Sequence, residues 1–139
     1  MAIDLRGVCP LLEVYDMPTS VKFYRDVLGF EVVTTSPLLG PDPDKFHWCL
    51  LRLGGAEIML NDAYEFDEDR PIPEDPKRVA AHRDTGLFFG SPDVDAVYEH
   101  LRAKGVAVKP PKVAQYGMKQ LYLTDPDGYG LCFQWRAED

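Results

Sequence analysis

Cysteine, histidine and basic residues are scarce in this sequence. Its 139 residues include three histidines and three cysteines, Cys9, Cys49 and Cys132. An odd number of widely spaced cysteines without a CxxC pair argues against a secreted disulfide framework and favours buried free thiols. Lys and Arg number 15 against 23 Asp and Glu, which gives a net charge of −8. This balance argues against nucleic acid as a partner and favours cationic or neutral ligands.

Long apolar runs are also missing. No stretch approaches the roughly 20 apolar residues that cross a bilayer, so we expect no membrane association. The N-terminal sequence MAIDLRGVCP lacks the apolar core of a signal peptide, and we therefore expect a cytoplasmic protein. The chain length and a hydrophobic fraction of 45% fit a single globular domain over residues 1–139.

The first half of the chain, from about residue 8 to 61, predicts one β-α-β-β-β module. Alternating side chains predict a strand over 9–15. Apolar residues spaced by three and four predict an amphipathic helix over 21–28, which ends at Gly29. Three strands follow the helix, and the last two form a hairpin at Gly54.

The second half, from about residue 84 to 136, predicts the same order of elements. Asp16 and Asp93 each stand before a helix, and Gly29 and Gly105 each end one. The two pairs of landmarks are separated by nearly the same number of residues. A near-constant offset is typical of an internal duplication.

Three other stretches are expected to depart from this regular pattern. Residues 62–83 are rich in acidic residues and proline, which predicts a surface loop between the modules, and the sequence VAAH at 79–82 adds at most a short helical turn. Residues 106–108 predict a strand that Pro110 and Pro111 interrupt. The sequence Asp-Pro-Asp-Gly at 125–128 predicts a tight turn before the last strand.

The helix of each module can cover only one face of its sheet. The predicted fold is therefore α+β, with two βαβββ modules forming a cup-shaped mixed sheet and the helices on the outer face. Period-two alternation assigns the core residues that face the helices: Leu12, Val14, Ile58, Leu60, Leu87, Phe89, Phe133 and Trp135.

The inner face of the predicted cup and the aromatic residues near it supply the candidate ligand-binding residues. Carboxylates can pair with a cationic ligand, and aromatic rings can stack on a planar one. The candidates are Glu13, Trp48, Glu57, Met59, Phe88, Tyr116, Tyr122, Cys132 and Gln134.

Two segments carry a resemblance to a known family. PLLEVYDMPTSVKFYRDVLGFEVV, at 10–33, resembles the opening module of the vicinal-oxygen-chelate superfamily, and YGMKQLYLTDPDGYGLCFQ, at 116–134, resembles its closing strands. This superfamily includes glyoxalases, extradiol dioxygenases, fosfomycin-resistance enzymes and bleomycin-resistance proteins. The resemblance implies the fold but no single activity, because the superfamily hosts several unrelated chemistries.

Enzymes of the superfamily hold a divalent metal at four positions, which the resemblance places at Cys9, Met59, Gly86 and Cys132. A glycine has no ligating side chain and a methionine is a weak ligand, whereas a catalytic metal usually needs three protein ligands. We therefore expect no metal, no cofactor and no catalytic residue. The pattern is closest to the metal-free bleomycin-resistance proteins. It implies a homodimer that sequesters a small aromatic ligand, cationic ligands included.

Two alternatives stay open at this stage. The chain could be a lyase or dioxygenase with a non-standard metal or acid–base site, for which His47, Glu57 and Cys132 are the candidates. Cys9 and Cys132 could also form a redox or nucleophilic pair, against the simpler reading of two inert thiols.

Overall fold

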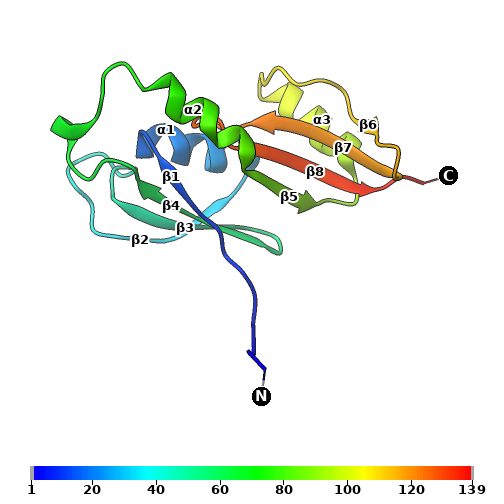
Figure 1. Ribbon diagram of the computed structural model, residues 1–139, viewed down its shortest axis with the longest axis horizontal. Helices are drawn as coiled ribbons and strands as arrows, with labels where there is room; N and C mark the ends of the chain where they lie inside the picture. The colour runs from blue at the N-terminus through cyan, green and yellow to red at the C-terminus, as the bar shows by residue number, and fades with distance from the viewer. Residues whose placement is uncertain (1, 139) are drawn as a thin grey trace. The chain divides into compact units, whose positions relative to one another are not determined.

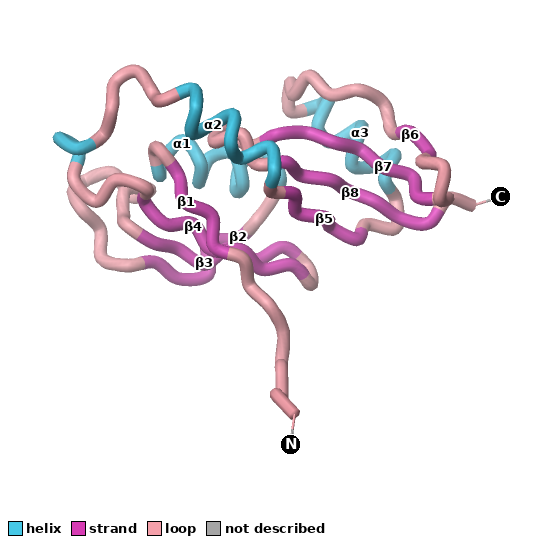
Figure 2. Tube along the Cα trace, in the orientation of Figure 1, coloured by secondary structure: helices cyan, strands magenta, loops and turns pink. Residues whose placement is uncertain are grey.

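The protein was analysed as a computed structural model that describes residues 2–138. The chain divides into two compact units, with the boundary between Pro71 and Ile72. Each unit contains one four-stranded sheet and its own helices (Figures 1 and 2). The predicted α+β class and the repeated β-α-β-β-β order are confirmed, with two four-stranded sheets.

Unit 1 builds its sheet in the order β1-β4-β3-β2, with β1 parallel to β4 and the other pairs antiparallel. Helix α1 packs against β4. The elements of unit 1 are β1 (Leu11–Val14), α1 (Met17–Lys22), the π-helix η1 (Phe23–Leu28), β2 (Glu31–Thr35), β3 (Trp48–Leu53), β4 (Ala56–Asp62) and the short 3-10 helix η2 (Asp67–Asp69).

The predicted signals at both ends of the first helix are confirmed. The side chain of Asp16 accepts a hydrogen bond from the backbone N–H of Thr19, which satisfies one of the unpaired donors of the first turn. Gly29 ends the helical stretch in the left-handed conformation, with φ of 98°. Between these ends the α-helix widens into η1, which buries Tyr24 and Leu28 against the sheet.

Unit 2 repeats this arrangement with the sheet order β5-β8-β7-β6, and β5 is parallel to β8. Helix α3 packs against β7 and β8. The elements of unit 2 are α2 (Pro76–Ala81), the 3-10 helix η3 (His82–Asp84), β5 (Gly86–Gly90), α3 (Val94–Ala103), β6 (Lys112–Val113), β7 (Met118–Thr124) and β8 (Gly130–Arg136).

Two elements of unit 2 differ from the sequence prediction. The strand expected at 106–108 is wrong, because this stretch pairs with no other strand and the pairing begins only after the two prolines, at Lys112. Within 62–83, α2 begins at Pro76, earlier than the short helical turn expected at 79–82. Its start has ordinary helix signals, since Asp75 caps the N-terminus and Pro76 occupies the first turn.

Helix α2 and the residue that follows it form hydrogen bonds with the turn at 125–128. Arg78 donates to the carboxylate of Asp127 at 2.8 Å, and Nδ1 of His82 donates to the carbonyl oxygen of Asp127 at 2.7 Å. The imidazole of His82 also stacks on the ring of Tyr129, with centroids 3.9 Å apart. Gly128 approaches the helix so closely that an added Cβ would lie 2.6 Å from the carbonyl oxygen of Val79.

The core prediction holds in unit 1 but only in part in unit 2, where Phe133 is buried while Leu87 and Phe89 are partly exposed. Leu12, Val14, Ile58 and Leu60 are all at most 3% exposed. Trp135 was expected in the core but is 46% exposed, because it lies near the end of β8 where the sheet borders solvent.

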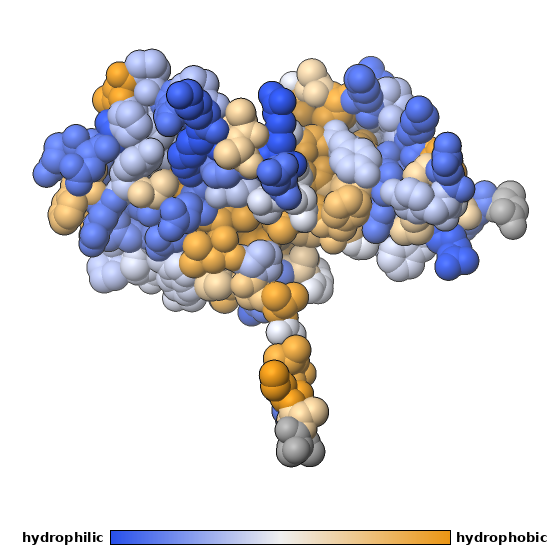
Figure 3. All heavy atoms as spheres, in the orientation of Figure 1, coloured by the Kyte–Doolittle hydropathy of each residue, from blue (hydrophilic) through white to orange (hydrophobic). Residues whose placement is uncertain are grey.

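The N-terminal arm, residues 2–10, leads into β1 at the edge of the unit 1 sheet. Its apolar side chains Ile3, Leu5 and Val8 are at least 79% exposed. Figure 3 shows this arm as a largely hydrophobic extension from the body of unit 1. Within residues 2–138, none of the helices has the length and apolar character that crossing a bilayer requires.

Candidate functional site

The open face of the unit 2 sheet carries three side chains in a row. Phe88 on β5 and Tyr122 on β7 both lie in register with Cys132 on β8, so the three project from the same face. The rings of Phe88 and Tyr122 meet edge to face, with centroids 6.1 Å apart. Cys132 is 1% exposed, while each ring is 55% exposed. An aromatic platform therefore faces solvent on this side of the sheet.

Beside the platform, Gln120 holds together a network of polar side chains. Its Nε2 donates to the hydroxyl of Tyr116 and to Oε1 of Gln134, both at 2.8 Å. Its Oε1 accepts a hydrogen bond from the hydroxyl of Tyr122 at 3.1 Å. Gln120 is buried, and both the NH2 group and the oxygen of its side-chain amide are hydrogen-bonded. It therefore fixes the positions of the two tyrosine hydroxyls.

The five unit 2 candidates from the sequence lie in this one connected cluster, since Tyr122 joins the platform to the network. The electrostatics keep the cluster neutral near pH 7. Desolvation, the thiol of Cys132 and the hydroxyl of Tyr116 together raise the pKa of Tyr122 to about 12. Burial likewise raises the pKa of the Cys132 thiol, although a hydrogen bond with Tyr122 opposes the shift. The cluster can thus bind through hydrogen bonds and ring contacts but holds no anionic nucleophile.

A groove of about 970 Å³ extends this face along the edge of β7. One wall is formed by most of the segment 106–115, and the other by β7 residues that include Gln120, Tyr122 and Thr124. Figure 1 shows this segment running from α3 to β6. The volume lies at the upper end of the usual range for small-molecule pockets, roughly 300–1,000 Å³.

Two prolines explain why the groove exists. The ladder between β6 and β7 contains only two pairs, and Lys112 opposite Gln120 is the last of them. Continuing the same register would place Pro110 opposite Tyr122, but a proline has no N–H to donate. The chain before Pro111 therefore separates from β7 instead of completing a longer strand.

The unit 1 candidates lie on the open face of the other sheet. Glu13 on β1 and Trp48 on β3 are both in register with Asn61 on β4, so they flank it on the two sides. Met59, two residues earlier on β4, lies between Leu11 and Leu50. This face thus offers an apolar strip with one carboxylate and one indole at its end.

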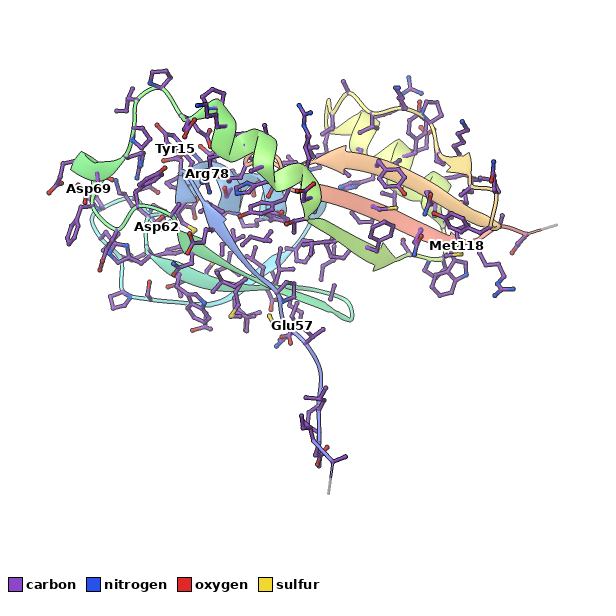
Figure 4. The ribbon with its side chains drawn as sticks, viewed as in Figure 1. Tyr15, Glu57, Asp62, Asp69, Arg78 and Met118 are labelled. Atoms are coloured by element: carbon purple, nitrogen blue, oxygen red, sulfur yellow. The ribbon has the colours of Figure 1, made fainter. Side chains whose placement is uncertain are left out.

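The three candidates for an enzymatic site do not form one group. His47 donates through Nδ1 to Asp62 at 2.9 Å, beside the end of β4, whereas Glu57 pairs with Arg52 at 2.7 Å near its beginning. Asp62 and Glu57 are labelled at these opposite ends of β4 in Figure 4. Burial raises the pKa of Asp62, although its hydrogen bond with His47 opposes the shift. Cys132 belongs to unit 2.

All three cysteines are free thiols, and each has a raised pKa. Burial raises the pKa of Cys49 to about 12. Cys9 is only partly buried, and its pKa is raised by desolvation and by the negative charge of Glu57. A raised pKa lowers the thiolate fraction at neutral pH, which favours inert thiols over a reactive pair.

The residues do not fit the metal centre of enzymes with this fold. Of the four positions taken from the resemblance, Gly86 has no side chain, Met59 offers a thioether, and Cys9 and Cys132 carry raised pKa values. Within residues 2–138, there is no group of three or more His, Cys, Asp or Glu side chains that could hold a metal ion.

The comparisons with known proteins agree with this fold. The family model of the Glyoxalase/Bleomycin resistance protein/Dioxygenase superfamily matches residues 10–133. The chain belongs to this superfamily. Members share a fold and not a chemistry, so membership alone leaves the activity undetermined.

Several solved structures resemble the chain. A glyoxalase/bleomycin resistance protein/dioxygenase from Nocardioides has a TM-score of 0.70 at 21% identity, covering 99% of this chain and 87% of that one. TnmS3, an antibiotic binding protein from Streptomyces, has a TM-score of 0.68 at 23% identity, covering 98% and 100%. A bleomycin-binding protein in complex with bleomycin has a TM-score of 0.66 at 17% identity, covering 97% and 100%. At these identities the likeness is one of fold.

Sequence reasoning missed three residues that shape the unit 2 site. Gln120 and Tyr122 are two positions apart on β7, so the strand pattern alone could have placed both side chains on one face. Lys109 and Lys112 line the groove on either side of the two prolines. No pattern signalled them, because the groove depends on where the strand ladder stops.

Proposed function

We propose that this protein binds a small aromatic organic molecule in the unit 2 groove and sequesters it without a metal ion. The observation that carries the proposal is the groove itself, bordered by an aromatic platform and by hydroxyl groups that Gln120 holds in place. A ligand pocket typically combines apolar walls with a few fixed polar groups of this kind. Tyr122 supplies both, since its ring can stack on a planar ligand while its hydroxyl belongs to the network.

Sequestration fits these residues better than catalysis. A catalytic site needs a base, a nucleophile or a metal near the bound molecule. The raised pKa values of Tyr122 and Cys132 keep both groups protonated near pH 7. The imidazole–carboxylate pair of His47 and Asp62 belongs to unit 1, and neither residue lines the groove.

Two of the similar structures are described as binding bleomycin and as binding an antibiotic. We extend this class of ligand to the present chain, acting in the cytoplasm, as a proposal about chemical type. The proposed contacts in unit 2 are Phe88, Tyr116, Tyr122, Cys132 and Gln134. The open face of unit 1, with Glu13, Trp48, Glu57 and Met59, is proposed as a second contact surface.

Thermal-shift and calorimetric titrations test the proposal. The panel contains planar aromatic compounds of two to four rings, with neutral, cationic and anionic members and bleomycin. We expect at least one compound to bind with a dissociation constant in the micromolar range and to lose affinity at least fivefold in Tyr122→Leu.

The matched control is Phe66→Leu, which removes an equally exposed ring from unit 1; Phe66 is 56% exposed and Tyr122 is 55% exposed. This variant should bind as the unchanged protein does. If no member of the panel binds at millimolar concentration, or if both variants lose affinity equally, the proposed site is wrong.

We also propose that the protein is a homodimer. The exposed side chains of Ile3, Leu5 and Val8 precede the edge strand β1, and an apolar arm beside an unpaired edge offers a surface for a second copy. Light scattering across a concentration series should give twice the mass of one chain. A variant with Ile3, Leu5 and Val8 replaced by serine should already be monomeric at concentrations at which the unchanged protein is still a dimer. If the unchanged protein is a monomer throughout the series, the proposal is refuted.

A further inference from the structure

The charge of the groove differs from that of the whole chain. Residues 100–124 contain Arg102, Lys104, Lys109, Lys112 and Lys119 and no acidic residue, although acidic residues outnumber basic ones across the chain. The groove draws most of its lining from this segment. No aspartate or glutamate is among its lining residues.

Lys109 and Lys112 both line the groove and both are exposed. Within residues 2–138, neither takes part in an ion pair, whereas Lys45, Arg52, Arg78 and Lys119 all pair with carboxylates. What distinguishes these two lysines is their place, since both line a groove that has no acidic lining residue. They leave positive charge available to a ligand.

The backbone that carries these two lysines has restricted conformational freedom. Pro110 and Pro111 separate them, and the fixed φ of proline limits the conformations of the segment. Lys112 also lies opposite Gln120 in the β6–β7 ladder, so the two side chains leave the sheet on the same face as neighbours. The Lys112 side chain therefore starts next to Gln120, from which its ammonium group can reach the groove.

We propose that the ligand of this groove is an aromatic carboxylate, whose ring lies against Tyr122 and the apolar wall and whose charge pairs with Lys109 and Lys112. The inference rests on the proposed function and adds the sign of the ligand's charge. The net charge of −8 favoured a cation at first, but charge interactions are screened over about 8 Å at physiological salt, so the lysines that line the groove decide the contact.

A set of three ligands with one ring system tests the sign of the charge. Naphthoate, naphthamide and naphthylmethylammonium share the naphthalene ring and differ in charge, and their affinities are measured by calorimetry at low and high salt. We expect naphthoate to bind most tightly, naphthamide less and the ammonium compound least. Added salt should weaken only the binding of naphthoate.

Variants assign the effect to the two lysines. Lys109→Gln with Lys112→Gln should weaken naphthoate about tenfold, because both exposed ion pairs with the carboxylate are lost together, and should leave naphthamide unchanged. Lys104→Gln, in the same basic segment but outside the groove, is the control and should change neither. Equal or tighter binding of the ammonium compound, or an equal loss of naphthamide in the double variant, would overturn this inference alone. Failure of all three ligands, while another member of the panel binds, would also overturn this inference alone, and failure of the whole panel would overturn the proposed function together with it.

Discussion

Replacing Arg78 with methionine removes the cation that faces a buried carboxylate. The Asp127 side chain is 2% exposed and that of Arg78 is 16% exposed, with 2.8 Å between Nη1 and Oδ1 (Arg78 is labelled in Figure 4). Breaking a buried ion pair by removing one partner costs about 3–5 kcal/mol, because the remaining charge stays uncompensated. We expect a loss near the lower end, about 3 kcal/mol, because Arg78 is partly hydrated and is shared with Glu74.

The second variant separates the buried charge from the lost packing. Arg78→Met combined with Asp127→Asn leaves a neutral amide of the same shape in place of the carboxylate. The double variant should therefore be more stable than Arg78→Met alone, with a coupling energy of about 1–3 kcal/mol. The matched control is Arg52→Met, whose exposed pair with Glu57 should contribute less than about 1 kcal/mol.

Urea unfolding followed by tryptophan fluorescence measures these differences. The chain has two tryptophans, one in each unit, so a Trp48→Phe background leaves Trp135 on β8 as the reporter for unit 2. A loss of about 3 kcal/mol should also lower the melting temperature by about 10 °C. The reasoning is refuted if Arg78→Met loses less than about 1 kcal/mol, or if the two substitutions are simply additive.

Three further predictions concern backbone, pH and thiols. Gly128→Ala should destabilise by at least 1 kcal/mol more than Gly117→Ala in urea unfolding, since both have φ of 86° but only Gly128 meets a neighbouring carbonyl. Asp62→Asn should lose stability relative to the unchanged protein as the pH falls, because the raised pKa of Asp62 means that the folded state takes up its proton more readily. Iodoacetamide should label Cys9 in the folded protein but Cys49 only after unfolding, as read by peptide mass spectrometry.

Each of these predictions has a clear contrary outcome. Equal losses for the two glycine variants would show that the approach to Val79 relaxes without cost. For Asp62, the unchanged protein should gain stability over Asp62→Asn as the pH falls, and this gain should be complete below the ordinary pKa of 3.8 and absent above the raised pKa. A stability difference that does not depend on pH contradicts the raised pKa. Labelling of Cys49 at the same rate as Cys9 would show that its core position opens in the folded protein.

The fold could be predicted from local signals, because the first turn and the last turn of both predicted helices are marked by residues adjacent to them in the sequence. Asp16 and Asp93 cap the first turns, and Gly29 and Gly105 take the positive φ that ends a helix. Helix α2 was predicted only as a short turn at 79–82, and its start at Pro76 was not predicted. Its cap and first-turn proline were present, but the surrounding acidic composition favoured a loop.

The site was only half predictable, because it depends on pairing between distant segments. Alternation placed Phe88, Cys132 and Gln134 on one face without any knowledge of the other strands. The central position of Gln120 follows from its register with Gln134 on β8 and Lys112 on β6, which a single strand pattern does not contain. The groove required the ladder to stop at Lys112, which is a property of the sheet.

The two prolines before β6 also bear on self-association. A strand edge with free N–H and C=O groups is a template on which another chain can add, and β7 would present such an edge beyond its short pairing with β6. The segment containing Pro110 and Pro111 runs alongside that edge and can donate little to an incoming strand. The same two prolines that leave the groove open beside β7 thus help to keep the protein from polymerising through its sheet.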